Sequence, residues 1–177
     1  MIENDNKLII ESLNGKINSF GKLVEKYQNK MFNLAIQITN DSDASNDITQ
    51  DVFIKAYEKL NTFDQNKKFF SWIYRITLNA ALNYKNHLQF TKNFDNDSMF
   101  EGKSASEEIE TNERSKAVQK TIKSLDDKYR TLVILKHYQE LSYEEITEIT
   151  KLPIGKIKSR LYIARDNLRK SLEGINK

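Results

Sequence analysis

The chain has 177 residues, of which 38% are hydrophobic and 30% charged, and its formal net charge is only +3. This length fits one ordinary domain or two small ones, and the modest charge excludes a protein that is a polycation over its whole surface. The absence of cysteine excludes disulfides and thiolate metal sites, which suits a protein of the reducing cytoplasm.

No part of the chain is predicted to enter a membrane. The N-terminal residues show neither a basic segment nor a long apolar core, so we expect no signal peptide. No apolar run approaches the roughly 20 residues that a membrane span needs. With one proline and five glycines, and no evident period-2 alternation, the sequence predicts an all-α fold.

Residues 5–89 are predicted to form a first, helical domain. We expect one or two short helices over 5–27, broken near Gly15, and a longer helix over 28–39. Ser42 or Asp43 should cap a third helix that ends near residue 60, and an aromatic-rich helix should follow over 69–86. The predicted buried stripe of the third helix is Ile48, Val52, Phe53, Ala56 and Leu60.

An acidic linker is predicted over residues 90–105, between this domain and a second helical domain over 106–177. Between residues 95 and 113 there are seven acidic residues and one basic residue, which favours a tether with little fixed structure. The first helix of the second domain should begin near Ser104 or Ser106. Asp126 should then cap a helix that ends near Gln139.

The second domain is predicted to close with a helix-turn-helix. Ser142 and Glu145 have the spacing of a capping box, and Pro153 should end the first helix near Lys151. In the helix that follows, apolar residues recur at helical spacing and predict one buried side. These residues are Ile157, Leu161, Ala164 and Leu168.

The other sides of this last helix are basic or polar. Seven basic residues and one acid lie between residues 151 and 170. A helix that is anchored on one side and basic on the other is what a DNA major groove accepts, so we interpret it as a DNA-recognition helix. The alternative is a solvated surface helix in a bundle.

Two further stretches are candidates for binding sites. Between Phe63 and Tyr84, aromatic residues occur beside basic ones, which is typical of surfaces that stack unpaired bases, although the same rings could fill a helical core. Asp47, Gln50 and Asp51 form one polar face, which could equally be solvated. No catalytic Ser/His/Asp set, glycine-rich phosphate loop or metal-ligand cluster is evident, so we expect neither an enzyme nor a bound metal or cofactor.

At two places the sequence resembles a known family. FGKLVEKYQNKMFNLAIQIT, DSDASNDITQDVFIKAYEKLNTF and FFSWIYRITLNAALNYK resemble region 2 of the sigma-70 family of transcription initiation factors. SLDDKYRTLVILKHYQELSYEEITEITKLPIGKIKSRLYIARDNLRKSL resembles region 4 of that family. The order of the two regions, and the absence of a recognisable region 3, resemble the compact extracytoplasmic-function (ECF) group.

The resemblance implies roles for particular residues. Those implied to dock on the β′ clamp helices of core RNA polymerase are Asp47, Gln50, Asp51 and Phe53. Those implied to capture and unpair the promoter −10 element are Phe63, Lys67, Lys68, Trp72, Arg75 and Asn79. Those implied to read the −35 element are Lys156, Lys158, Ser159, Arg160, Tyr162 and Arg165. The implied partners are core polymerase, including its β flap, promoter DNA and, in some members, an anti-sigma protein.

The sequence departs from the family's usual pattern at three points. Lys151 stands where the turn often has glycine, so a non-glycine residue is expected to take a positive φ. Ile163 stands where a basic residue is frequent, and Lys85, Asn86 and His87 replace an arginine cluster. We therefore expect these positions to alter affinity and promoter choice rather than the class of protein.

Two other classes of protein remain alternatives at this point. One is a helix-turn-helix regulator that binds a palindromic operator as a dimer without polymerase, and the other is a purely structural helical adaptor.

Overall fold

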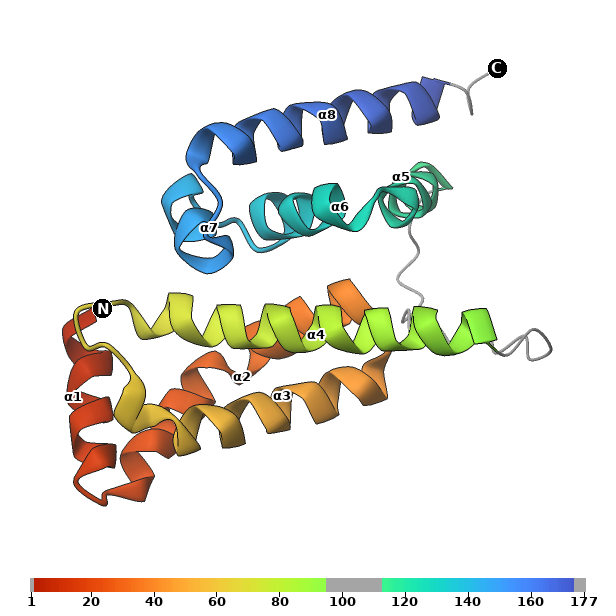
Figure 1. Ribbon diagram of the computed structural model, residues 1–177. Helices are drawn as coiled ribbons and strands as arrows, with labels where there is room; N and C mark the ends of the chain where they lie inside the picture. The colour runs from red at the N-terminus through yellow and green to blue at the C-terminus, as the bar shows by residue number, and fades with distance from the viewer. Residues whose placement is uncertain (1, 95–112, 174–177) are drawn as a thin grey trace. The chain divides into compact units, whose positions relative to one another are not determined.

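The computed structural model describes residues 2–94 and 113–173, and all regular structure in these ranges is helical (Figure 1). The all-α prediction is thereby confirmed. The chain divides into two compact units, residues 1–105 and 106–177. No helix in the described ranges is long and apolar enough to cross a membrane.

The first unit contains helices α1 (Ile2–Leu13), α2 (Ile17–Thr39), α3 (Ser42–Glu58) and α4 (Phe69–Phe94), with a short 3-10 turn, η1, over Leu60–Thr62. Helix α2 packs against α1, α3 and α4, and α3 also packs against α4 (Figure 1). The core between them holds fully buried side chains from each helix, among them Ile9, Leu23, Met31, Leu34, Val52, Phe69, Ile73 and Tyr74.

Helix α2 corrects the prediction of two helices that meet near residue 28. Its buried residues continue without interruption through Leu23, Tyr27, Met31 and Leu34, at spacings of three or four. This stripe packs against three neighbours at once, so no break is needed where the sequence becomes locally polar. The predicted break near Gly15 is confirmed, since Gly15 has a φ of 86° between α1 and α2.

The cap of α3 is also corrected. Asp41, not Ser42 or Asp43, is the N-cap, and its Oδ1 accepts a hydrogen bond from the backbone N–H of Ala44 at 3.0 Å. Asn40 just before it has a φ of 59°, which reverses the chain so that Asp41 reaches the start of the helix. All five residues of the predicted stripe are buried, with Leu60 in the η1 turn just after the end of α3.

Helix α4 is longer than predicted, since it ends at Phe94 rather than near Asn86. The polar residues after Asn86 include no glycine or proline, and polarity alone does not end a helix. Residues 90–94 of the predicted linker are therefore helical. The rest of that linker, and the predicted helix start near Ser104, lie outside the described residues.

The second unit contains α5 (Glu113–Ser124), α6 (Asp127–Val133), a π-helical segment η2 (Ile134–Tyr138), α7 (Tyr143–Thr150) and α8 (Ile154–Glu173). Helix α8 packs against α5, α6 and α7. The most deeply buried side chains are Leu132, Leu135, Ile146, Ile149, Ile157 and Leu161. The predicted Asp126 cap is confirmed, because its side chain accepts from the backbone N–H of Lys128.

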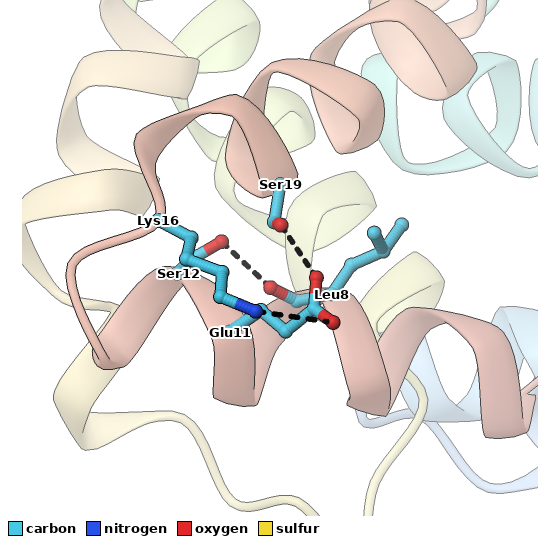
Figure 2. A network of polar contacts seen from close by, with 5 residues as sticks. All are labelled: Leu8, Glu11, Ser12, Lys16 and Ser19. Atoms are coloured by element: carbon cyan, nitrogen blue, oxygen red, sulfur yellow. Dashed lines mark hydrogen bonds and ion pairs between the residues drawn. The ribbon is translucent and has the colours of Figure 1, made fainter.

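Polar contacts fix α1 on α2 at two points. Near the corner between them, Glu11 accepts a hydrogen bond from Ser19 Oγ at 2.7 Å and lies 3.9 Å from Lys16 Nζ, as Figure 2 shows. At the other end, the buried Asp5 carboxylate forms an ion pair with Lys26 and accepts from the Tyr27 hydroxyl at 2.5 Å. Burial and this hydrogen bond raise the pKa of Tyr27 well above its ordinary value.

We expect Asp5→Ala to lower the free energy of unfolding of the first unit by about 1–3 kcal/mol, because it leaves the buried Tyr27 hydroxyl without its acceptor. Trp72 is the sole tryptophan, so urea denaturation followed by its fluorescence reports on this unit. Tyr27→Phe keeps the Lys26–Asp5 ion pair and should cost less. An unchanged urea midpoint in Asp5→Ala would contradict the stabilising role given to the Asp5 carboxylate.

Candidate nucleic-acid interface and docking face

The turn between α7 and α8 is built from local hydrogen bonds. Ser142 Oγ accepts from the backbone N–H of Glu145 at 3.1 Å, and Glu145 Oε2 accepts from the backbone N–H of Ser142 at 2.8 Å, which confirms the predicted capping box. At the other end of α7, Lys151 takes a φ of 62°, as expected of the residue that stands in place of glycine. Proline at position 153 then prevents α7 from continuing.

Helix α8 has one buried side and one open side. Ile157, Leu161 and Ala164 are at most 1% exposed, and Leu168 is partly exposed near the helix end. Of the six residues predicted to read the −35 element, five have exposed side chains and Arg160 is partly buried. The Tyr162 side chain is 71% exposed. These six side chains therefore lie off the buried stripe, where a duplex could reach them.

The basic side chains along α8 are not equally available to contact phosphates, because two of them are paired with an acid. Asp166 Oδ2 lies 2.7 Å from Lys170 Nζ, and Asp166 Oδ1 lies 3.0 Å from Arg169 Nη2. These hydrogen bonds from Lys170 and Arg169 lower the pKa of Asp166, so the acid stays ionised and offsets positive charge near the C-terminal end. The positive charge that remains is concentrated between Lys156 and Arg165.

Arg160 lies close to the N-terminus of α6. The pKa of Asp126 is lowered mainly by hydrogen bonds from Lys128 and, to a smaller degree, by the positive charge of Arg160. That carboxylate also caps α6, so Arg160 of α8 is weakly attracted to the start of α6.

Tyr143 gathers two lysines that come from different elements. Lys136 Nζ, from the π-helical segment, lies 4.7 Å from the ring centroid, and Lys158 Nζ, from α8, lies 5.3 Å from it. Lys136 Nζ also donates to the Leu141 carbonyl at 2.9 Å. A cation over an aromatic ring is attracted to it, so Tyr143 holds both ammonium groups at the start of α7.

Lys136 and Tyr143 were not among the residues predicted from the sequence to form this site. Their proximity depends on the π turn over residues 134–138, where the Gln139 N–H donates to the Ile134 carbonyl at 2.9 Å. It also depends on Glu140, which has a φ of 54°. Neither feature has a recognisable local signal in the residues, since a positive φ is typical of glycine or asparagine.

The polar face of α3 is exposed. The side chains of Asp47, Gln50 and Asp51 all reach solvent, and Asp51 Oδ2 lies 3.9 Å from the exposed Lys55 ammonium. Phe53, in contrast, is only 7% exposed and belongs to the core between the helices. The prediction that Phe53 is buried is confirmed. Its contact with core polymerase stays a prediction.

The aromatic stretch before and within α4 divides between core and surface. Phe63 and Phe69 are buried and pack edge-on at 5.8 Å between ring centroids, so these two rings fill the core, one of the two possibilities that the sequence left open. Phe63 also lies 5.2 Å from the partly exposed Trp72. The buried Phe63 ring therefore packs against Trp72 and supports it, and Phe63 is not itself a stacking surface for a base.

The other residues predicted to capture the −10 element lie in the loop before α4 and in the first part of that helix. Arg75 is partly exposed on the same helix as Trp72, and Asn79 is exposed one turn further along. In the loop before α4, Lys67 Nζ lies 3.3 Å from Asp64 Oδ2, while Lys68 is partly buried. Trp72, Arg75 and Asn79 thus share the outer side of α4.

Tyr84 links α4 to the start of α3. Its hydroxyl donates to Asp41 Oδ2 at 3.1 Å, while Oδ1 of the same carboxylate caps α3. Burial and the hydrogen bond to Asp41 raise the pKa of Tyr84 above its ordinary value. One carboxylate therefore holds the helix with the acidic face against the helix that carries Trp72.

Family models match the chain in two segments, one in each unit. Sigma-70 region 2 matches residues 23–90, and Sigma-70, region 4 matches residues 115–168. In the described residues, no group of three or more histidine, aspartate or glutamate side chains is placed to hold a metal ion.

The full length of the chain also matches curated relatives. It is 34% identical to the RNA polymerase sigma-H factor of Pseudomonas aeruginosa, with 97% of this chain and 95% of the relative covered. It is 31% identical to the ECF RNA polymerase sigma factor SigW of Bacillus subtilis, with 96% and 97% covered. The chain belongs to the extracytoplasmic-function group of the sigma-70 family, which confirms the resemblance found in the sequence.

Solved structures share the fold. CnrH, solved with the cytosolic domain of CnrY, has a TM-score of 0.72 at 22% identity, covering 97% of this chain and 98% of its own. RpoE of Bartonella quintana, solved with the anti-sigma factor NepR, has a TM-score of 0.71 at 22% identity, covering 87% and 96%. Family membership makes this protein a sigma factor, and the dimeric operator-binding regulator is not favoured.

We expect Lys151→Gly to raise the stability of the helix-turn-helix by up to about 1 kcal/mol. Glycine adopts a positive φ without the steric cost that lysine has. Part of this stabilisation is lost because glycine also makes the unfolded chain more flexible. Slower amide hydrogen exchange in α7 and α8 would report the change. Lys151→Ala, which removes the charge but keeps the Cβ atom, should not slow exchange, and equal effects of both would contradict the prediction.

Proposed function

We propose that the two units divide the work of promoter recognition. The first, over residues 5–89, binds core polymerase and the −10 element, and the second, over residues 106–177, binds the −35 element. The rest of the predicted linker, residues 95–105 with its neighbouring acids, passes along the polymerase as a tether. The protein itself catalyses no reaction and acts in the cytoplasm, where core polymerase makes RNA.

Docking on core polymerase is assigned to the exposed acidic face of α3. Asp47, Gln50 and Asp51 lie on that face, outside the buried stripe of the helix. Carboxylates in an interface raise the rate of encounter with a basic partner and select against acidic ones. The partner surface on the polymerase is the β′ clamp helices, and the second unit also contacts the β flap.

Capture of the −10 element is assigned to the outer side of α4. Trp72 offers a partly exposed ring supported by Phe63, and Arg75 and Asn79 lie beside it. Lys67 and Lys68 in the preceding loop supply positive charge for the strand's phosphates. Stacking a base on an aromatic ring is worth about 1–3 kcal/mol, which can offset a melting cost of a few kcal/mol per base.

Recognition of the −35 element is assigned to the open side of α8. The observation that carries the proposal is that Lys156, Lys158 and Ser159 are exposed on the sides of α8 that lie off the buried residues Ile157, Leu161 and Ala164, in the segment matched by region 4. Lysine and arginine contacts to phosphates supply most of the affinity, and Arg160, Tyr162 and Arg165 supply contacts that distinguish bases.

An anti-sigma protein is a further candidate partner. Its support is the shared fold with RpoE of Bartonella quintana, which was solved with the anti-sigma factor NepR.

Asp51→Ala should weaken binding to core polymerase about tenfold or more, because the basic group of the polymerase that pairs with Asp51 is then desolvated without a carboxylate. The exposed Asp51–Lys55 pair contributes little to folding, so the fold should be unchanged. Fluorescence titration of labelled protein with core polymerase measures the affinity. Glu25→Ala, which removes an exposed acid from α2, is the matched control and should bind normally.

Arg160→Ala should weaken binding to a −35 duplex by about 1–3 kcal/mol if the guanidinium contacts a base. Binding is measured by fluorescence anisotropy at fixed salt concentration. Arg169→Ala is the matched control, since Asp166 already neutralises that side chain, and its effect should be smaller. Equal losses in the two variants would count against a specific role for Arg160.

A further inference from the structure

Ile54 lies at the centre of the exposed face of α3. Its side chain is 57% exposed, although isoleucine is among the residues most often buried. At 100° per residue, Ile54 projects between the directions of Asp47 and Gln50, one turn further along the helix. The sequence motif places an apolar member at Phe53, but the structure buries that ring and exposes its neighbour instead.

Tyr57 extends the apolar surface beside Ile54. It is 42% exposed and follows Ile54 by three residues, so the two side chains are neighbours on the helix. The Tyr57 ring packs edge-on against the buried Phe20, with 5.0 Å between ring centroids. This contact limits the motion of Tyr57, so little conformational entropy is lost when a partner covers it.

Acidic side chains surround this apolar pair. Asp43, Asp47, Asp51 and Glu58 are all exposed on α3, and a single lysine, Lys55, pairs with Asp51. An apolar centre with a charged rim is the usual arrangement of a protein interface in which a few central residues supply most of the affinity.

The charge of the rim selects the occupant. Phosphates of nucleic acid and anionic lipid head groups would be repelled by four carboxylates, as would the same face of a second copy of this chain. A protein surface with basic side chains around an apolar depression fits. We propose that Ile54, supported by Tyr57, is the apolar anchor of the contact with core polymerase, an inference that rests on the docking role proposed for α3.

The chain supplies a matched control for this anchor. Ile17, at the start of α2, is 65% exposed, and it lies in the corner between α1 and α2 rather than on the acidic face. Substitution of Ile17 and substitution of Ile54 each remove an exposed isoleucine, so the two variants differ only in where that side chain lies. Neither side chain contributes to a buried core, so both variants should fold.

The experiment measures binding of the full chain to purified core polymerase by fluorescence titration. Ile54→Ser should weaken binding about tenfold or more, while Ile54→Met, which keeps an apolar side chain, should stay within about threefold of wild type. Ile17→Ser should bind as wild type does. Circular dichroism checks that the helices of each variant are intact.

Each result decides the proposal. Equal affinity of Ile54→Ser and wild type, with Asp51→Ala still weakened, would overturn the anchor and leave the docking role standing. An equal loss in Ile17→Ser would also overturn it, because the effect would not depend on the acidic face. Failure of wild type to bind core polymerase would overturn the docking role itself, and the anchor with it.

Discussion

Burial of one side only is the constraint on which each binding helix depends. Helix α8 commits Ile157, Leu161 and Ala164 to the core, and α3 commits Val52, Phe53 and Ala56. With one side anchored by apolar contacts, rotation of the helix about its axis would expose that surface to water. The opposite side is therefore held in one orientation, basic on α8 and acidic on α3, before any partner arrives.

Polar contacts then fix the positions of helices that apolar packing alone would leave free to slide. The Asp41 carboxylate caps α3 and accepts from Tyr84 of α4, so the proposed polymerase face and the proposed −10 face belong to one rigid pair of helices. In the second unit, Tyr143 holds Lys136 and Lys158 at the start of α7. Such preorganisation lowers the entropic cost of binding.

The sequence predicted those features whose causes are local or periodic. The capping box at Ser142, the Asp126 cap and the buried stripes of α3 and α8 follow from residue type and spacing. The positive φ at Lys151 was expected from the family resemblance, because the family often has glycine there. The features it missed depend on contacts made by the fold. The turn at Asn40 brings the Asp41 carboxylate to the start of α3, where it caps the helix. Packing against the Phe69 ring buries Phe63. The exposure of Ile54 likewise depends on which neighbours cover α3.

We propose that this chain directs core polymerase to promoters through two separate DNA-binding surfaces, one on each unit. Transcription in vitro tests this role most directly: purified core polymerase and this protein are given genomic DNA fragments, and the 5′ ends of the RNA are mapped. Defined starts are expected that appear only when both proteins are present and that share −35 and −10 sequences. Starts that are the same with and without this protein would contradict the proposed role.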